Sequence, residues 1–315
     1  MTQTQAGRQG AVADAVAGNW VDRLAPAPAR PFLRLSRADR PAGTWLLLIP
    51  CWWGLGLAVA AHGATPFALC IALGCAVGAF LMRGAGCTWN DVTDRRFDAA
   101  VARTRSRPIP SGQVGVRAAL AWMVVQALLA FGILLTFPPA AIGLGVLSLL
   151  PVAVYPFAKR FTWWPQAFLG IAFNWGALLA WAAHAGGLGA APVLLYGAGI
   201  AWTLFYDTIY AYQDVEDDAL IGVRSTARRF GDRPGPWMRG FAFAAVTLMA
   251  AAVWAALPPA PAAVASMGVA AFGLHLAWQL RSLDPGDPEA CLRLFRANRD
   301  AGLLVVPFLG LAALA

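Results

Sequence analysis

Three oxygen-bearing side chains recur every four residues in the stretch from Asn90 to Asp98. Asn90, Asp94 and Asp98 occupy positions i, i+4 and i+8, so on a helix they lie on one face. Carboxylate and amide oxygens suit a hard cation, and Mg²⁺ typically binds through one or two carboxylates plus the phosphates of a substrate. The spacing predicts half of a Mg²⁺–phosphate site; the alternative is an N-capping aspartate cluster in a solvated loop.

The setting of this cluster is apolar. A run from Pro66 to Met82 contains no charged residue and leads directly into it. A carboxylate placed at the middle of a bilayer costs roughly 2.5–3.5 kcal/mol on insertion scales. Acidic residues next to such a run therefore indicate a function rather than a solvated surface.

A second acidic cluster follows the apolar run from Tyr196 to Tyr206. Asp207, Asp214 and Asp218 are separated by steps that return to nearly the same helix face, and Tyr210 lies beside them. Two acidic helix faces in one apolar chain predict a two-sided clamp for a metal-bound diphosphate.

The composition indicates a membrane protein. Of the 315 residues, 59% are hydrophobic and only 13% are charged, with a mean hydropathy of +0.59; soluble domains carry about 25% charged residues. A membrane helix needs about 20 apolar residues, so the length accommodates around nine. The predicted spans are 42–61, 66–86, 114–136, 139–157, 164–184, 190–211, 239–257, 260–280 and 298–315.

The basic residues fall in alternate loops. No Lys or Arg occurs near 62–65, 137–138, 185–189 or 258–259, whereas the loops between them are basic. This is the positive-inside pattern, and it predicts that the N-terminus and both acidic clusters are cytoplasmic. Topology and phosphate binding account for the net charge of +8 without a nucleic-acid partner.

The N-terminal residues 1–30 are polar and rich in Ala and Pro, which predicts a flexible tail before a single transmembrane domain over 31–315. No secretory signal peptide is evident. The tail has Arg and few acids, so a mitochondrial presequence stays open. A short bacterial tail is the simpler interpretation, and we expect a multi-pass protein of a bacterial inner (cytoplasmic) membrane.

Four basic positions are candidates for binding anions. Arg103 and Arg107 lie in a loop interrupted by prolines, next to the first acidic cluster, where they would bind diphosphate. Lys159 is the only lysine in the chain, which favours a need for a compact ammonium. Arg83 lies two turns before Asn90 and would hold a carboxylate through two hydrogen bonds. Each has an alternative. Arg103 and Arg107 could simply belong to a solvated positive-inside loop, and Lys159 could be a helix-end anchor. Arg83 could be a snorkelling arginine or a partner of the aspartates.

These residues resemble those of a known family. Asn90-Asp91-x-x-Asp94-x-x-x-Asp98, with Arg103-Thr104-x-x-Arg107-Pro108-x-Pro110-Ser111-Gly112, resembles the first motif of the UbiA superfamily of intramembrane prenyltransferases. The segment from Tyr206 to Asp218, with Ile221 to Ala227, resembles the second. Asp39-Arg40-Pro41-x-Gly43-Thr44, Tyr155-Pro156-Phe157-x-Lys159-Arg160 and Pro165-Gln166-x-x-Leu169-Gly170 are similar to its 4-hydroxybenzoate polyprenyltransferase branch.

The resemblance implies an all-α bundle of nine transmembrane helices around a central cavity. It implies Mg²⁺-dependent transfer of a polyprenyl chain from polyprenyl diphosphate to position 3 of 4-hydroxybenzoate, a step of ubiquinone biosynthesis. Metal ligands would be Asn90, Asp94, Asp98, Asp214 and Asp218; catalytic residues Asp94, Asp98, Lys159, Asp207 and Asp214; and substrate-binding residues Arg37, Arg83, Arg103, Arg107, Tyr155, Tyr210 and Arg224.

Several alternatives remain open at this point. Within the family, the acceptor could be a naphthoate, a homogentisate, a haem or a chlorophyllide. Outside it, midplane carboxylates also occur in polytopic transporters, and a non-catalytic protein could bind lipid diphosphates. The base that removes the ring proton would be Asp91, Asp217 or a diphosphate oxygen.

Overall fold

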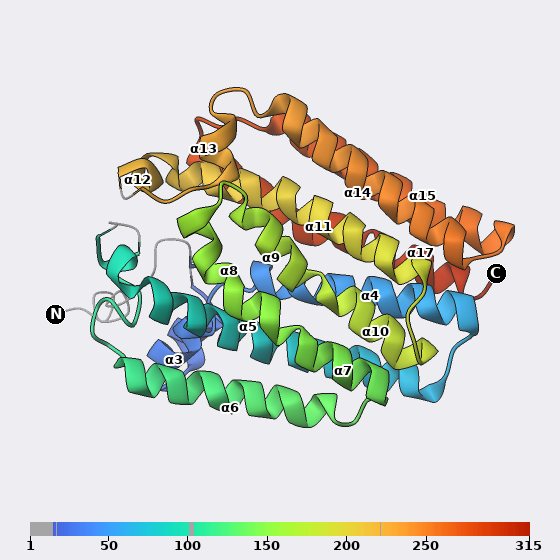
Figure 1. The fold of residues 1–315 in the computed structure, drawn as a ribbon, viewed down its shortest axis with the longest axis horizontal. Helices are drawn as coiled ribbons and strands as arrows, with labels where there is room; N and C mark the ends of the chain where they lie inside the picture. The colour runs from blue at the N-terminus through green and yellow to red at the C-terminus, as the bar shows by residue number, and fades with distance from the viewer. Residues whose placement is uncertain (1–14, 17, 101–103, 221) are drawn as a thin grey trace. The chain divides into compact units, whose positions relative to one another are not determined.

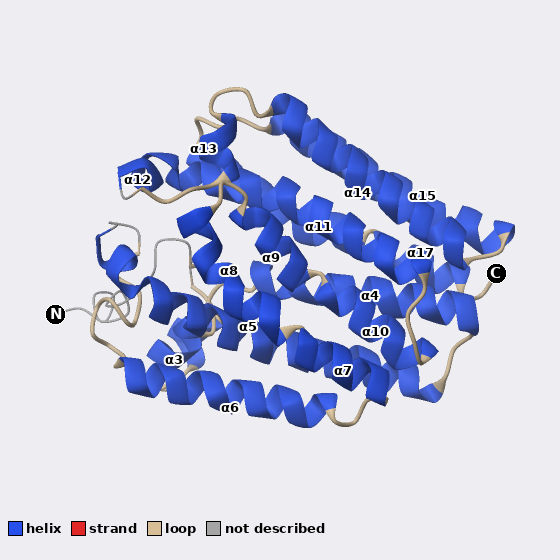
Figure 2. Ribbon diagram, in the orientation of Figure 1, coloured by secondary structure: helices blue, strands red, loops and turns tan. Residues whose placement is uncertain are grey.

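The computed structural model describes residues 15, 16, 18–100, 104–220 and 222–315. Within them every regular element is a helix, as Figures 1 and 2 show, which confirms the all-α prediction. The elements are α2 (Trp20–Leu24), α3 (Arg30–Leu35), α4 (Ala42–His62), α5 (Pro66–Ala100), α6 (Val116–Leu134), α7 (Pro139–Leu147), α8 (Leu149–Phe161), α9 (Pro165–Phe173), α10 (Trp175–Ala185), α11 (Ala190–Ala211), η1 (Tyr212–Asp214), α12 (Val215–Leu220), α13 (Thr226–Phe230), α14 (Gly235–Ala256), α15 (Pro259–Ser282), α16 (Pro288–Leu303) and α17 (Val305–Ala312).

Seven helical segments in the described part of the chain are long and apolar enough to cross a membrane. They correspond to seven of the nine predicted spans, so the multi-pass prediction holds and the count of nine is not confirmed. The predicted span 190–211 forms the 22-residue helix α11, whose C-terminal turns carry Asp207 and Tyr210 of the second motif. The predicted span 298–315 is divided between α16 and α17.

The chain forms two compact units, which we describe separately. Unit 1 comprises Met1–Thr44 and Val77–Ile133, and unit 2 comprises Trp45–Ala76 and Leu134–Ala315. The first acidic motif belongs to unit 1 and the second to unit 2. Part of the predicted tail is helical, because α2 lies within it; the single transmembrane domain over 31–315 stays a prediction.

Unit 2 has a core of aromatic and small side chains crossed by hydrogen bonds. Trp53 and Trp202 are fully buried, with ring centroids 4.9 Å apart. Trp202 Nε1 donates to Asn298 Oδ1 over 2.8 Å, and Asn298 Nδ2 donates to Gln279 Oε1 over 2.8 Å. Buried polar groups need such partners in an apolar interior, and they fix how α11, α15 and α16 pack.

Small residues allow close helix contact in unit 2. A Cβ added at Gly54 of α4 would collide with the backbone carbonyl oxygen of Ala177 in α10. A backbone group cannot move aside as a flexible side chain can. Only glycine therefore fits at this crossing, as is common where membrane helices approach closely.

In unit 1, helix α3 is held by a polar contact with α6. Ser36 Oγ donates to Gln126 Oε1 over 2.9 Å and accepts from Trp122 Nε1 at 2.9 Å. Gly84 of α5 leaves room for this contact, because a Cβ there would collide with Gln126. The pairing fixes the turn that follows α3, which carries Arg37.

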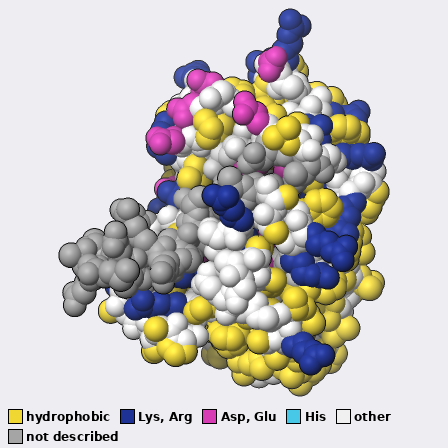
Figure 3. All heavy atoms as spheres, turned by 90° about the vertical axis from the view of Figure 1, so that its left-hand side faces the viewer, with side chains coloured by type: hydrophobic (Ala, Val, Ile, Leu, Met, Phe, Trp, Pro, Cys, Tyr) yellow, Lys and Arg dark blue, Asp and Glu magenta, His cyan; other side chains and the backbone are white. Residues whose placement is uncertain are grey.

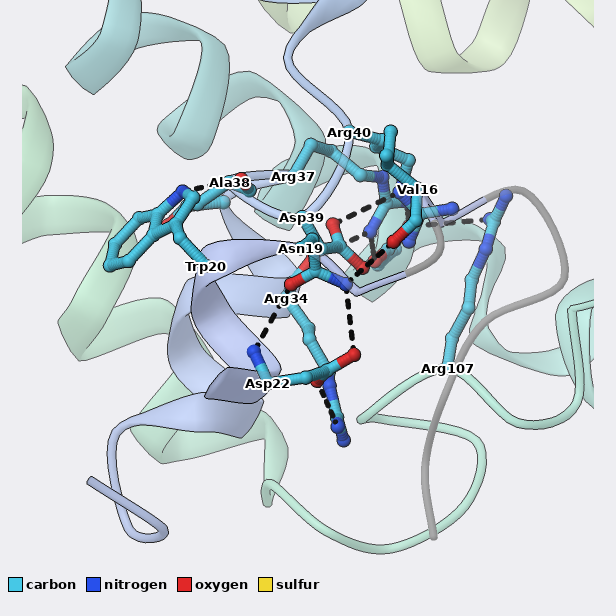
Figure 4. Close-up of polar contacts among 12 residues, drawn as sticks. Val16, Asn19, Trp20, Asp22, Arg34, Arg37, Ala38, Asp39, Arg40 and Arg107 are labelled. Atoms are coloured by element: carbon cyan, nitrogen blue, oxygen red, sulfur yellow. Dashed lines mark hydrogen bonds and ion pairs between the residues drawn. The ribbon is translucent and has the colours of Figure 1, made fainter. Parts of the chain in front are cut away.

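Asp39 follows in the same turn and is 1% exposed. Its Oδ1 accepts from Arg40 Nε over 3.2 Å, whereas its Oδ2 is buried without a hydrogen bond among the described residues (Figure 4). Burial disfavours the charged form and raises the pKa of Asp39 to about 6, although Arg37 opposes the shift. Ionisation of Asp39 therefore lowers the free energy of unfolding of the protein.

We expect Gly54→Ala to lower the thermal stability of the purified protein. The added methyl group meets a backbone oxygen, and overpacking of this kind costs about 1–3 kcal/mol. Gly78→Ala is the matched control, because a Cβ there meets nothing within 4 Å. Thermal unfolding in detergent measures both, and equal melting temperatures for the two variants would contradict the close-packing argument.

We expect the stability of the protein to depend on the ionisation of Asp39. Its folded-state pKa is raised, so its contribution is fully present below the ordinary value of 3.8 and is lost as the pH rises through about 6. Asp39→Asn should therefore melt at a higher temperature than the wild type at pH 7.5 and at a similar one near pH 4. A variant less stable than the wild type at pH 7.5 would show that the carboxylate is net stabilising.

Candidate active site

The first motif lies on one uninterrupted helix, as its spacing predicted. Helix α5 runs through the apolar segment and the whole cluster. Asp94 is fully buried and Asp98 is 7% exposed, whereas Asn90 is half-buried. Two carboxylates buried on consecutive turns of an apolar helix need compensating charge.

A third carboxylate on this helix, Asp91, is paired with Arg37, a residue that we predicted to bind substrate. Arg37 NH2 and NH1 donate to the two oxygens of Asp91 over 2.6 and 2.9 Å, and both side chains are buried. Burial opposes the charge of Arg37, but the attraction of Asp91 outweighs it and raises the pKa of Arg37 above its ordinary value. Arg37 has the left-handed φ of +57°, so the turn after α3 adopts an unfavourable conformation to make this contact.

Arg107 joins the same cluster from the loop that follows α5. Its NH1 donates to Asp98 Oδ2 and Oδ1 over 2.9 and 3.1 Å and approaches Asp91 Oδ1 at 3.3 Å. The loop is fixed by Thr104, whose hydroxyl donates to the Asp98 carbonyl over 2.9 Å. Figure 4 shows Arg107 extending from this loop toward the cluster. Arg103, predicted to bind diphosphate, lies outside the described residues.

Arg83 lies against the start of α4. A Cβ at Gly43 would come within 2.5 Å of Arg83 NH2, so the glycine makes room for the guanidinium. This explains the glycine of the Asp39–Thr44 motif in physical terms. The predicted carboxylate-binding arginine is half-buried near the N-terminal end of α4.

The second motif is helical but not uniform. Helix α11 ends at Ala211, the chain tightens into the 3₁₀ turn η1, and α12 begins at Val215. A 3₁₀ turn has about three residues per turn, so the strict one-face spacing predicted for a single α-helix does not continue past Ala211. Asp207, Asp214 and Asp218 are half-buried. Tyr210 packs on Phe295, with ring centroids 4.5 Å apart.

Three candidate residues meet within unit 2. The Arg224 backbone N–H donates to the Lys159 carbonyl over 3.1 Å, and Arg224 NH1 donates to the Phe161 carbonyl over 2.8 Å. The Val223 N–H donates to the Asp218 carbonyl over 3.0 Å. The end of α8, the end of α12 and the loop before α13 are therefore in contact, with Tyr155 one turn before Lys159 on α8.

Two buried polar contacts near the second motif were not predicted, although Gln166 belongs to one of the motifs that carry the resemblance. Gln166 Oε1 accepts from the Thr226 N–H over 3.1 Å and so ties α9 to the Arg224 loop. Asn174, between α9 and α10, donates through Nδ2 to Thr203 Oγ1 over 2.8 Å, and Thr203 donates to the Tyr206 hydroxyl over 3.0 Å. An amide within an apolar run is the signal that could have identified each.

The donor set suits a hard cation only if a substrate completes it. No group of three or more His, Cys, Asp or Glu side chains among the described residues could hold a metal by itself. The oxygen donors of Asn90 and Asp94 fit Mg²⁺, which binds few carboxylates and takes its other ligands from phosphates and water. Because the two motifs belong to different units, their convergence on one ion stays a prediction.

The fold is similar to those of solved UbiA homologues. An apo UbiA homologue from Aeropyrum pernix K1 matches with a TM-score of 0.69 at 24% identity, covering 86% of this chain and 96% of that one. A UbiA homologue from Archaeoglobus fulgidus bound to GPP and Mg²⁺ matches with a TM-score of 0.68 at 18% identity, covering 90% of this chain and 100% of that one. At these identities the likeness concerns the fold.

Curated proteins are similar at higher identity. The chain is 46% identical to the mitochondrial 4-hydroxybenzoate polyprenyltransferase of Bos taurus over 91% of its own length and 76% of that protein. It is 45% identical to the protein of that name in Homo sapiens, over 91% and 76%. The Arabidopsis thaliana protein of that name is 43% identical over 91% and 70%.

These relatives contradict the predicted location. They are mitochondrial enzymes of eukaryotes, so they point to a mitochondrial membrane rather than a bacterial inner membrane. The positive-inside pattern concerns the side on which basic loops lie and carries no information about which membrane holds the protein. An Arg-containing, acid-poor N-terminus is compatible with either, and the prediction of a bacterial tail was wrong.

The sequence profile of the UbiA prenyltransferase family matches residues 47–301. This range contains both acidic motifs, the Lys159 segment and the Arg224 loop. Together with relatives 43–46% identical over nine-tenths of the chain, it establishes the family. The chain belongs to the UbiA prenyltransferase family.

Proposed function

We propose that this chain transfers a polyprenyl group from polyprenyl diphosphate to the ring carbon ortho to the hydroxyl of 4-hydroxybenzoate, with Mg²⁺ as the required ion. The observation that carries the proposal is the 46% identity over 91% of the chain to a protein named for that activity. The buried carboxylates of α5 and the basic groups around Asp218 are what the transfer needs. The reaction is a step of ubiquinone biosynthesis.

Oxygen ligands would come from Asn90, Asp94 and Asp98 in the first motif and from Asp214 and Asp218 in the second. When bound, Mg²⁺ neutralises the diphosphate and makes it a better leaving group. Asp94 is the central member of the first set, because it is fully buried one turn from each of its neighbours.

The basic residues hold the leaving group. We assign Lys159 and Arg224 to the diphosphate, because backbone hydrogen bonds join their two segments of unit 2 to each other and to the Asp218 carbonyl. Arg107 serves from unit 1, and we assign the same role to Arg103. Positive groups fixed before the reaction stabilise charge as it develops on the departing diphosphate.

The acceptor is oriented by its carboxylate. Arg83 binds the carboxylate through its planar guanidinium, which matches two oxygens at once. Tyr155 and Tyr210 contact the substrates, and the surrounding apolar side chains exclude the water that would quench an allylic cation. Asp91 is an unsuitable base because Arg37 occupies both its oxygens, which leaves Asp217 or a diphosphate oxygen to take the ring proton.

The function is tested with purified membranes, 4-hydroxybenzoate, a labelled polyprenyl diphosphate and Mg²⁺. We expect 3-polyprenyl-4-hydroxybenzoate, and we expect a chelator to abolish it. We also expect Asp94→Asn to reduce turnover at least about a hundredfold, since it removes a charge that the ion requires. The exposed Asp232→Asn should behave as the wild type.

Membrane insertion and the melting temperature of Asp94→Asn should match those of the wild type, which separates chemistry from folding. Product from a naphthoate or homogentisate but none from 4-hydroxybenzoate would reassign the acceptor. Normal turnover by a folded Asp94→Asn would contradict the assigned role of the carboxylate.

Arg83→Ala should raise the KM for 4-hydroxybenzoate about 10- to 100-fold, because charged hydrogen bonds contribute roughly 1.5–3 kcal/mol. Arg83→Lys should recover part of this loss, because it keeps the charge without the fork of donors. The KM for the diphosphate donor is the internal control and should change little. An unaltered KM for the acceptor in Arg83→Ala would refute the assignment.

A further inference from the structure

Arg107 forms hydrogen bonds to Asp98, a carboxylate that we assign to the metal site. Its NH1 lies 2.9 and 3.1 Å from the two oxygens of Asp98, and the two side chains are 11% and 10% exposed. Water screens such a pair weakly, so the contact is a strong charge-assisted one. A cation cannot take Asp98 as a full ligand without displacing the guanidinium.

The guanidinium has a second anchor. The same NH1 lies 3.3 Å from Asp91 Oδ1, and Asp91 is held in place by two hydrogen bonds from Arg37. Arg37, in the turn after α3, and Asp91, on α5, form a contact that does not involve Asp98. When Arg107 leaves Asp98, its hydrogen bond to Asp91 keeps the guanidinium close to Asp98.

Arg107 also has a donor to spare. Its Nε is buried and has no hydrogen-bond partner among the described residues. A buried donor without an acceptor costs about 1–3 kcal/mol, so it marks a position for an anion. A diphosphate oxygen can accept this hydrogen bond from Arg107 Nε. Among the described residues, no carboxylate accepts it.

We propose that Arg107 is a latch on Asp98, positioned by the Arg37–Asp91 pair, that makes divalent-cation binding depend on diphosphate. This inference rests on the proposed function. Without diphosphate, the guanidinium holds Asp98 and the cation binds weakly. When diphosphate binds, the Arg107 guanidinium forms hydrogen bonds to it instead of to Asp98. Asp98 is then available as a ligand of the cation, while Arg37 and Asp91 keep Arg107 close by. Arg37 and Asp91 are thus positioning residues.

The device has a consequence for the order of events. A ligand that removes a competitor of a second ligand raises the affinity for it, and by linkage the effect is reciprocal. Cation and diphosphate therefore bind cooperatively. The cation site forms fully only when the donor is present.

The test is a Mn²⁺ titration of the purified full-length protein in detergent, followed by electron paramagnetic resonance of free Mn²⁺, with and without inorganic pyrophosphate. Protein-free titrations correct for Mn²⁺ bound by pyrophosphate itself. For the wild type we expect weak binding of Mn²⁺ alone and binding about tenfold tighter with pyrophosphate. For Arg107→Gln we expect Mn²⁺ alone to bind about tenfold tighter than to the wild type, since no charge-assisted bonds are broken. Pyrophosphate should then add less than about threefold.

Arg96→Gln is the matched control, because it removes an exposed positive charge from the same helix without touching Asp98. It should keep the wild-type dependence on pyrophosphate. Asp91→Asn provides a second measurement: Mn²⁺ should still bind, and the gain from pyrophosphate should fall, because Arg107 is no longer held nearby. Both variants are checked by their melting temperatures.

The proposal is overturned if Arg107→Gln binds Mn²⁺ alone no more tightly than the wild type, or if Arg96→Gln produces the same gain as Arg107→Gln. Loss of Mn²⁺ binding in a folded Arg107→Gln would also overturn it. Prenyl transfer is measured separately. If the protein transfers prenyl groups but Arg107→Gln does not bind Mn²⁺ more tightly, the latch is refuted and the proposed function stands. If Arg107→Gln binds Mn²⁺ as predicted but no prenyl transfer occurs, the proposed function is refuted and the latch stands.

Discussion

Charge buried among apolar side chains must be balanced by charge of the opposite sign, and this constraint determines how unit 1 is built. Asp91 is fully buried on a helix that begins as a membrane span, and Arg37 is the group that balances it. To reach Asp91, Arg37 adopts a left-handed backbone conformation in the turn after α3. Breaking one partner of a buried pair leaves an uncompensated charge, which typically costs about 3–5 kcal/mol. The turn after α3, which the Ser36 contact with α6 also holds, and the loop that carries Arg107 both meet at this pair.

Unit 2 meets the same constraint with hydrogen bonds instead of ion pairs. Asn298 links α11, α15 and α16, and Gln166 ties α9 to the loop that carries Arg224. Backbone hydrogen bonds join Lys159, at the end of α8, to the Arg224 loop, and that loop to the Asp218 carbonyl six residues earlier in the chain. Binding groups on rigid, mutually braced elements need little reorganisation when charge develops on a substrate. In both units, the polar groups that pair with one another inside the apolar interior also position the residues that we assign to the substrates.

The sequence was most informative where a local rule decided the structure. The i, i+4, i+8 spacing after an apolar run correctly predicted that Asn90, Asp94 and Asp98 share one helix. It could not predict the Arg37–Asp91 pair, because the partners are 54 residues apart and only tertiary packing brings them together. The change from α11 to a 3₁₀ turn at Tyr212 left no periodic signal. The membrane was assigned wrongly because an N-terminal tail with Arg and few acids fits a bacterial tail and a mitochondrial presequence equally well.

We propose that acidic side chains from both motifs bind one ion together with diphosphate. A double-mutant cycle of Asp94→Asn and Asp214→Asn, with Mn²⁺ affinity measured in the presence of pyrophosphate, tests it most directly. If the two carboxylates hold the same ion, the loss in the double variant will be well below the sum of the single losses in free energy, because the first substitution already disrupts the shared site. Strictly additive losses, or a loss from only one of the two substitutions, would contradict a shared ion.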